Sequence, residues 1–388
     1  MSTISRRSSE ASKKAIVAGH ICLDITPVFP VTSWKSEKEL LTPGTLIQME
    51  GVDIHTGGAV ANTGLAMKKF GIEVSLIAKV GQDEFGGLIM NLLKEYDVGQ
   101  QLITDSSSST SYSIVLAMPG VDRIFLHNPG ANNRFMSDDI KEDDLEGVSV
   151  FHFGYPPLMK SLYDREGEEL ERLFRKVKKA GIVTSLDLAA VDPSTEVANV
   201  NWKHILEKTL PYVDFFMPSV EELCFMIDRA RYEELKRRAE GIDIISVLDI
   251  EKDVAPLAKQ CMAMGAKLVV IKCGALGMYY KTSSCEILSS LEQSLPLDSY
   301  DWGLKEGFES SYVPNKVLSG TGAGDTCIAA FLSAAMKGYS FMDCIRLAAA
   351  AGAACVSAYD ALSGLLPLEE LKVLIDNGWE KEGRYKRC

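Results

Sequence analysis

Residues 319–325, which read SGTGAGD, combine residue types that can bind an anion and accept a proton. An apolar run at 326–335 follows directly and predicts a helix that begins at this turn. Small residues leave the first backbone amides of such a helix accessible, and the helix dipole favours negative charge there. Asp325 would stand beside the bound anion. Helix capping is an alternative reason for an aspartate at this position.

A second glycine-rich turn, Gly57-Gly58, precedes the small-residue segment 59–64. Without side chains at these two positions, a polyhydroxylated ligand can lie against the backbone. Asn62 can donate and accept hydrogen bonds with the hydroxyls of such a ligand. Close packing of a helix on a sheet is an alternative reason for glycine and alanine here.

The sequence does not contain the motifs of several other nucleotide-binding and metal-binding sites. Residues 319–325 do not end in the Gly-Lys-Ser/Thr of a Walker loop, and no GxGxxG follows the first apolar run at 15–23. The nine cysteines include no CxxC pair, and the five histidines have no metal-binding spacing. We therefore expect no dinucleotide fold and no zinc site, and we predict reduced cysteines and a cytoplasmic location.

Short apolar runs alternate with longer amphipathic stretches along most of the chain, which predicts strands alternating with helices. The expected strands are 15–23, 74–80, 148–153, 182–188, 214–217, 268–272 and 277–281. The expected helices are 59–70, 86–95, 167–179, 254–264, 325–337, 342–358 and 369–377. This order favours a three-layer α/β/α fold with a mostly parallel central sheet.

Two regions depart from this alternation, at about 25–53 and 110–127. The first contains three prolines and no helical pattern, and the second has short β-like runs around a Pro-Gly turn. We predict that both contribute to one small β-sheet that forms a lid over a site. The remaining expectations are a disordered tail at 1–14, a single domain over 15–378, an irregular surface excursion at 283–313 and a C-terminal tail at 379–388.

The charge balance limits the classes of partner. The 388 residues carry a formal net charge of -12 and contain 46% apolar residues, which is typical of a folded protein. Because no basic cluster interrupts this acidity, we expect neither nucleic acid nor an anionic membrane surface as the main partner. The longest uncharged stretch near the C-terminus, 347–359, is shorter than the roughly 20 residues that a membrane-spanning helix needs.

The order of these features resembles the ribokinase/PfkB family of carbohydrate kinases. The resemblance covers about residues 15–375 and rests on GGAVAN at 57–62, GQDEFG at 81–86 and TGAGD at 321–325. Supporting matches are NPGAN at 128–132, PSVEE at 218–222 and KCGALG at 272–277. The resemblance implies a ribokinase-like fold and an ATP-dependent sugar kinase that acts with Mg²⁺.

The resemblance also implies a role for individual residues. Asp325 corresponds to the general base, and the amides of Gly322, Ala323 and Gly324 correspond to an anion hole for the transferred phosphoryl group. Glu222 corresponds to the acidic residue that holds Mg²⁺ through water. The implied sugar-binding residues are Asp24, Gly57, Gly58, Asn62 and Arg123, the last within the lid. The implied nucleotide-binding residues are Lys272, Gly274, Gly277, Thr321, Gly322 and Gly324.

Three positions depart from the family pattern. Ser319 replaces an aspartate that often helps to place a monovalent cation, so activation by K⁺ is in doubt. Ser219 replaces an asparagine near the metal. Lys272 replaces a common threonine, and it either reaches a phosphate of the nucleotide or is a solvated lysine at a strand end.

The expected substrate is a ketohexose or pentose, and the expected assembly is a homodimer formed through the lid. Two alternatives stay open at this stage. One is a nucleoside kinase of the same family, and the other is a non-catalytic sugar- or nucleotide-binding protein on this fold.

Overall fold

A computed structural model describes residues 14–30, 43–118 and 124–383 of the chain. Its main feature is an eight-stranded sheet in the order β14-β13-β12-β11-β10-β9-β1-β4. Neighbouring strands from β4 to β12 are parallel, whereas β13 and β14 add an antiparallel edge. The strands are β1 (Lys14–Gly19), β4 (Glu73–Ile77), β9 (Val148–Gly154), β10 (Val183–Leu186), β11 (Phe215–Phe216), β12 (Leu268–Lys272), β13 (Gly277–Thr282) and β14 (Glu306–Ser310).

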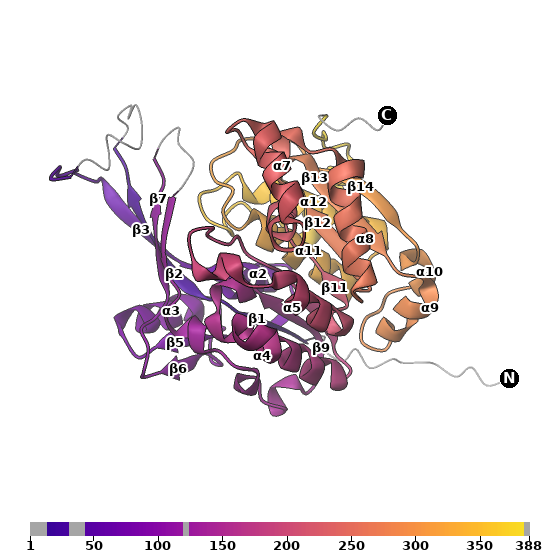
Figure 1. The fold of residues 1–388 in the computed structure, drawn as a ribbon, viewed down its shortest axis with the longest axis horizontal. Helices are drawn as coiled ribbons and strands as arrows, with labels where there is room; N and C mark the ends of the chain where they lie inside the picture. Colours follow the sequence, from indigo (N-terminus) through magenta and orange to yellow (C-terminus); the bar gives the residue numbers. More distant parts are fainter. Residues whose placement is uncertain (1–13, 31–42, 119–123, 384–388) are drawn as a thin grey trace.

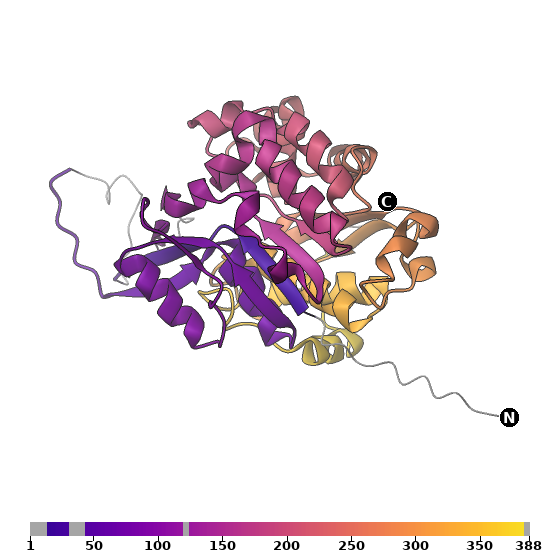
Figure 2. The same ribbon diagram turned by 90° about the horizontal axis from the view of Figure 1, so that it is seen from below.

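Helices cover both faces of this sheet. One face carries α2 (Gly58–Lys69), α3 (Glu84–Lys94), α9 (Cys285–Leu288), α10 (Ser299–Trp302), α11 (Ala323–Lys337), α12 (Phe341–Cys355) and α13 (Leu368–Asp376). The other face carries α4 (Lys160–Lys179), α5 (Trp202–Thr209), α6 (Val220–Ile227), α7 (Arg229–Ala239) and α8 (Ala255–Ala263). In Figure 2 the magenta-to-red helices lie on one side of the sheet and the yellow C-terminal helices on the other.

The buried strands explain why two cores form. Successive side chains of a strand point to opposite faces, so Ala15 and Val17 join the core beneath α2 and α11. Ile16 and Ala18 join the core beneath the α4–α8 group. A central strand with both faces covered reads as a continuous apolar run, as these strands do. The predicted three-layer fold with a mostly parallel sheet is confirmed.

A second sheet of four strands lies beside the main one, in the order β3-β2-β7-β8. Its strands are β2 (Cys22–Val28), β3 (Gly51–Gly57), β7 (Tyr112–Leu116) and β8 (Ile124–Asn128). Figure 1 shows β2, β3 and β7 extending away from the body of the molecule. The prediction that two distant regions build one small sheet is confirmed. A short parallel pair, β5 (Lys79–Gly81) with β6 (Ile103–Asp105), lies outside both sheets.

Three predictions about elements were wrong. The run 74–80 is not one strand, because it divides between β4 of the main sheet and β5 of the short pair. The apolar run 15–23 is not one strand, because the chain breaks at His20-Ile21 and divides the run between the main sheet and the small sheet. Residues 283–313 are not an irregular surface excursion: they form α9, α10 and the edge strand β14, and Trp302 lies in the core at 1% exposure.

The C-terminal segment continues to make contacts after α13. The indole of Trp379 donates to the carbonyl of Val313 at 2.8 Å, and the backbone of Lys381 forms an antiparallel β-bridge with that of Tyr312. Among the helices of the described residues, none is both long enough and apolar enough to cross a membrane.

Candidate active site

The polar residues of interest follow the carboxyl ends of adjacent parallel strands. His20 follows β1, Tyr155 follows β9 and Asp187 follows β10. Ser219 follows β11, and Lys272 is the last residue of β12. Because the carboxyl ends of parallel strands share one edge of the sheet, the topology gathers these side chains there. The N-termini of α2 and α11 lie at the same place, since a side-chain bond joins the two helices.

Asp325 lies in the first turn of α11 and is 2% exposed. The side-chain amide of Asn62 donates to Asp325 Oδ2 at 3.0 Å, and Thr63 Oγ1 donates to Oδ1 at 3.4 Å. Burial is the largest influence and raises the pKa of Asp325, while the bond from Asn62 and the charge of Lys272 act in the opposite direction. A carboxylate with a raised pKa and a fixed orientation can accept a proton from a substrate.

Tyr155 is a site residue that the sequence analysis did not identify. Its phenol donates to both carboxylate oxygens of Asp325, at 3.0 Å to Oδ1 and 2.8 Å to Oδ2. Burial, together with the nearby carboxylates of Asp325 and Asp187, raises the pKa of Tyr155 well above its usual value. The phenol therefore keeps its proton and acts as a donor. Its position directly after the expected strand 148–153 was the available signal.

Lys272 forms a buried ion pair with Asp187, at 2.8 Å between Nζ and Oδ1. Of the two alternatives for Lys272, the solvated lysine at a strand end is wrong, because the side chain is only 12% exposed. Burial opposes the charge of Lys272, but Asp187 and Glu222 outweigh it and raise the pKa of Lys272. Burial also raises the pKa of Asp187, to about 8, against the opposing influence of Lys272. Asp187 is a second residue that the sequence analysis missed.

The glycines before and within α11 leave room beside Lys272. A Cβ built on Gly324 would lie 3.4 Å from Lys272 Nζ, so the ammonium is close to the first turn of the helix. The amide of Gly324 is at a helical position that has no acceptor within its own helix. Two neighbouring amides are engaged in the turn: Ala323 donates to the Gly320 carbonyl at 3.3 Å, and Thr321 donates to Ser319 Oγ at 3.1 Å.

The turn before α2 is filled by protein side chains. A Cβ on Gly57 would lie 2.1 Å from Asp24 Oδ2, and a Cβ on Gly58 would lie 2.5 Å from His20 Nδ1. His20 Nε2 is 3.3 Å from His127 Nε2, and His127 Nδ1 is 3.0 Å from Ser113 Oγ. These contacts connect the small sheet to the body. Burial lowers the pKa of His20 well below its usual value, and burial also lowers the pKa of His127.

Glu222 has a structural role within α6. Its Oε2 accepts from the amide of Ser219 at 2.9 Å, and Ser219 Oγ accepts from the amide of Glu222, which forms a capping box. Among the described residues, no group of three or more His, Cys, Asp or Glu side chains can hold a metal. Mg²⁺ requires no such group, because it keeps several waters and binds one or two carboxylates together with substrate phosphates. The oxygen donors present fit that mode.

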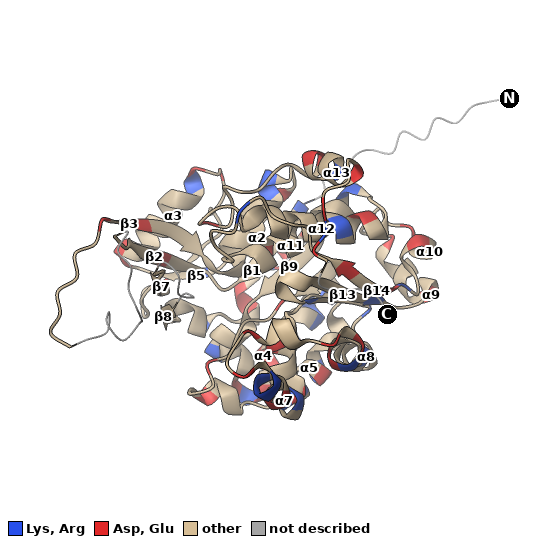
Figure 3. Cartoon of the chain, turned by 90° about the horizontal axis from the view of Figure 1, so that it is seen from above, with Lys and Arg blue, Asp and Glu red and all other residues tan. Residues whose placement is uncertain are grey.

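A cavity of about 840 Å³ opens beside this edge of the sheet. Ser219, Lys272 and Gly274 line it together with Glu221 of α6, and its remaining walls come from α7 and residues 241–245 after α7. Tyr232 and Lys236 of α7 line the cavity, and the basic character of α7 is visible in Figure 3. Neither residue is among the predicted site residues, because the sequence pattern predicts no helix between 180 and 253.

Gly277 does not line this cavity. Gly277 pairs with Ser310 of β14, and a Cβ there would lie 2.0 Å from the Glu309 carbonyl oxygen, so strand pairing accounts for this glycine. Arg123, the predicted lid contact to the sugar, lies outside the described residues.

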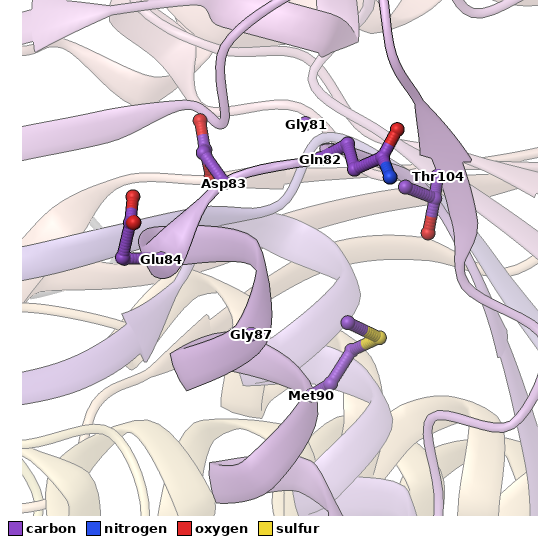
Figure 4. Close-up of a pocket in the computed structure, with 7 residues that line it drawn as sticks. All are labelled: Gly81, Gln82, Asp83, Glu84, Gly87, Met90 and Thr104. Atoms are coloured by element: carbon purple, nitrogen blue, oxygen red, sulfur yellow. The ribbon is translucent and has the colours of Figure 1, made fainter.

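A second cavity, of about 380 Å³, lies at the N-terminus of α3 and is shown in Figure 4. Its lining belongs mostly to the segment 81–87, with Met90 and Thr104. It shares no lining residue with the larger cavity and contains none of the residues around Asp325. Asp83 has a structural role here, since it caps α3 and accepts from Thr110 Oγ1 at 2.5 Å.

Comparison with known proteins agrees with the fold. The chain is 24% identical over 370 residues to a 5-dehydro-2-deoxygluconokinase of Clostridium perfringens, covering 93% of this chain and 95% of that protein. It is 26% identical over 312 residues to a ribokinase of Arabidopsis thaliana, covering 80% and 69%.

Among solved structures, an Arabidopsis thaliana ribokinase complexed with ribose and ATP matches with a TM-score of 0.67 and 21% identity, covering 94% of this chain and 99% of that one. A putative ribokinase II from E. coli in complex with ATP and Mg²⁺ matches with a TM-score of 0.67 and 20% identity, with the same coverage.

The family model for pfkB family carbohydrate kinases matches residues 21–367, which is most of the chain. This match includes both glycine turns, Asp325 and the whole edge of the sheet after β1. The chain therefore belongs to the PfkB family of carbohydrate kinases, phosphotransferases that have an alcohol group as acceptor.

Proposed function

We propose that this kinase transfers the γ-phosphoryl group of ATP to a hydroxyl of a small neutral sugar, a ketohexose or pentose. One observation carries the proposal. A buried carboxylate, Asp325, stands at the N-terminus of α11 within a network of fixed donors, and the same helix turn lies against the ammonium of Lys272. Proton acceptor and anion site are thus adjacent, as phosphoryl transfer to an alcohol requires.

Asp325 accepts the proton of the acceptor hydroxyl in this mechanism. The hydroxyl oxygen then forms a bond to the γ-phosphorus, and the bond from that phosphorus to the leaving oxygen of ADP breaks. The amides of Gly322 and Gly324 stabilise the charge on the transferred group, and Lys272 adds a cation beside them. The amide of Ala323 is left out of this set, because it donates to the Gly320 carbonyl. The raised pKa of Asp325 makes it a better proton acceptor than an exposed aspartate.

The cavity beside Lys272 and Gly274 is the proposed nucleotide site. Glu222 would hold Mg²⁺ through water with the Oε1 oxygen that is not used in the capping box. When bound, Mg²⁺ neutralises charge on the phosphates of the nucleotide.

The residues around Asp325 favour a neutral acceptor. Asn62 and Tyr155 are uncharged donors, and burial keeps His20 and His127 in the neutral form. Asp24 adds a second carboxylate near the turn before α2. Carboxylate and amide groups are suited to the hydroxyls of a sugar, and an acidic sugar would meet like charge.

The test is coupled ATP turnover against a panel of neutral ketoses and pentoses, sugar acids and nucleosides. We expect turnover with a neutral sugar and a weaker response to the acids. If the protein prefers a nucleoside, the substrate class is nucleosides and not sugars. If it binds a sugar tightly without turnover, it is a non-catalytic sugar-binding protein. Addition of K⁺ in the same assay tests monovalent activation at Ser319.

A homodimer through the small sheet and a cytoplasmic location stay predictions. Sedimentation measurements can test the homodimer.

A further inference from the structure

Tyr155 has an unusual backbone conformation. Its φ is 67° and its ψ is 41°, in the left-handed region that non-glycine residues rarely adopt, and Pro156 follows it. The residue before a proline is also disfavoured from helical conformations. Such a conformation costs on the order of 1–3 kcal/mol and persists only where the surrounding structure imposes it, most often at functional sites.

The strained backbone places the phenol against Asp325. One phenolic proton is shared between the two carboxylate oxygens, Asn62 donates to Oδ2, and Thr63 donates weakly to Oδ1. A carboxylate has about four acceptor sites, and these donors supply three protons. One acceptor site of the Asp325 carboxylate therefore remains available for the hydroxyl of a substrate. The three donors prevent the carboxylate from rotating.

We propose that Tyr155 is a positioning residue for phosphoryl transfer: it orients the Asp325 carboxylate so that its remaining acceptor site meets the sugar hydroxyl. This inference rests on the proposed role of Asp325 as the base. Nothing in the resemblance or in the glycine signatures assigns Tyr155 a role. Phosphoryl transfer is catalysed mainly by positioning and electrostatic stabilisation. A carboxylate that is already held in the reactive orientation therefore increases the rate.

Titratable groups from every neighbouring element act near Asp325. They are Tyr155 after β9, Asp187 after β10, Glu222 of α6, Lys272 of β12, Cys22 of β2, Cys327 of α11 and Cys355 of α12. The thiols stay protonated, since burial raises the pKa of Cys327 to about 12 and of Cys355 to about 11. Of this set, Tyr155 donates a hydrogen bond to the Asp325 carboxylate, so its removal acts on the base directly.

The test uses Tyr155→Phe in the full-length chain, with the sugar that gives turnover and a pH series for kcat. We expect kcat to fall about ten- to 100-fold with the KM for sugar nearly unchanged, because the lost bond is to a charged group. The acid limb of the kcat profile should move to higher pH, since loss of a donor to the carboxylate raises the pKa of Asp325.

Tyr279→Phe is the matched control. Tyr279 is a buried tyrosine of the same sheet whose hydroxyl donates to the carboxylate of Glu306, and its ring packs in the core on the opposite face of the sheet from α11. Tyr279→Phe also removes a hydrogen bond from a tyrosine hydroxyl to a carboxylate, but not the one to Asp325. We therefore expect kcat and the acid limb of its pH profile to be the same as in the wild type.

Two outcomes would overturn the positioning role. A lower KM with unchanged kcat would show that the phenol merely occupies the site of the sugar hydroxyl. A loss of kcat with an unmoved acid limb would show a structural effect only. If Tyr155→Phe does not fold, 3,5-difluorotyrosine at position 155 replaces it, and its stronger donor should move the acid limb to lower pH. Failure of Asp325 itself as the base is distinguished by full activity of Asp325→Asn.

Discussion

The two glycine turns of this protein look alike in sequence but differ in what surrounds them. Both precede buried helices rich in small residues, α2 and α11, which pack against each other. At the first turn, side chains of the protein fill the space beside the glycines, namely Asp24 beside Gly57 and His20 beside Gly58. At the second turn, a Cβ on Gly324 would make only ordinary contact with the lysine side chain of Lys272.

The difference separates two reasons for glycine. Gly58 has φ +84°, and a side chain there would collide with the backbone of His20, so the fold itself requires glycine. Gly324 lies in helical conformation with space for a methyl group, so the fold does not require glycine there. We therefore expect substitution of Gly58 to affect stability and substitution of Gly324 to affect catalysis. Gly322 of the second turn behaves like Gly58, since its φ is +74° and a Cβ there would lie 2.3 Å from Ala361 Cβ.

The largest expected effect is on Asp325, which lies in the first turn of α11 and accepts a hydrogen bond from Asn62 of α2. Asp325→Asn keeps the shape of the side chain but removes the proton acceptor, so kcat should fall by about 10³-fold or more. Coupled ATP turnover measures the loss, and a thermal melt checks that the variant is folded. Retention of most of the activity would exclude Asp325 as the base.

Gly58→Ala should lower the free energy of unfolding by about 2–4 kcal/mol, because it combines an unfavourable positive φ with a contact to the His20 carbonyl oxygen. Denaturant unfolding measures this change. Gly87→Ala is the matched control, since nothing lies within 4 Å of a Cβ at Gly87. An unchanged stability in Gly58→Ala would remove the contrast between the turns.

Lys272→Met should raise the KM for ATP by about ten- to 100-fold, since it removes the cation beside the α11 turn while preserving much of the buried chain. The KM for sugar should change little. Asp187→Asn in the same background restores a neutral partner and should recover stability without recovering the KM for ATP. A normal KM for ATP in Lys272→Met would place the nucleotide elsewhere.

Gly324→Ala should reduce kcat about tenfold while the free energy of unfolding stays within about 1 kcal/mol of the wild type. The added methyl group would lie between the first-turn amides and Lys272, where the transferred phosphoryl group is proposed to bind. Parallel kinetics and denaturant unfolding separate the two quantities. A loss of stability comparable to that of Gly58→Ala would contradict the comparison.

The smallest effect is a difference in pH dependence. The pKa of His20 is lowered on folding, so its contribution to stability is lost as pH falls below about 6.5. The pKa of Asp325 is raised, so its contribution is present below about pH 3.8 and is lost as pH rises through its folded pKa. We compare the slope of the unfolding free energy against pH, between pH 5 and pH 7, in each variant and in the wild type. Relative to the wild type, His20→Asn and Asp325→Asn should change this slope in opposite directions, by up to about 1.4 kcal/mol per pH unit. Equal slopes would contradict this assignment.

Much of the fold could be predicted because its strands are buried on both faces. The runs 148–153 and 268–272 are nearly continuous apolar segments, and they appear as β9 and β12 with boundaries shifted by at most one residue. The run 15–23 was misread as one strand, since the break at His20 depends on its contacts with Gly58 and His127 rather than on local composition. The helices α5, α6 and α7 were missed, and with them Tyr232 and Lys236.

The family, the two glycine turns and the aspartate at the start of α11 can be identified from the amino-acid sequence, because they depend on local backbone geometry and on the order of short segments. The tertiary structure alone decided which groups meet at Asp325. Tyr155 and Asn62 are far apart in the chain and converge because β9 and α2 end and begin at one edge of the sheet. It also decided that Lys272 is buried and paired with Asp187, since burial and partner depend on how distant strands align.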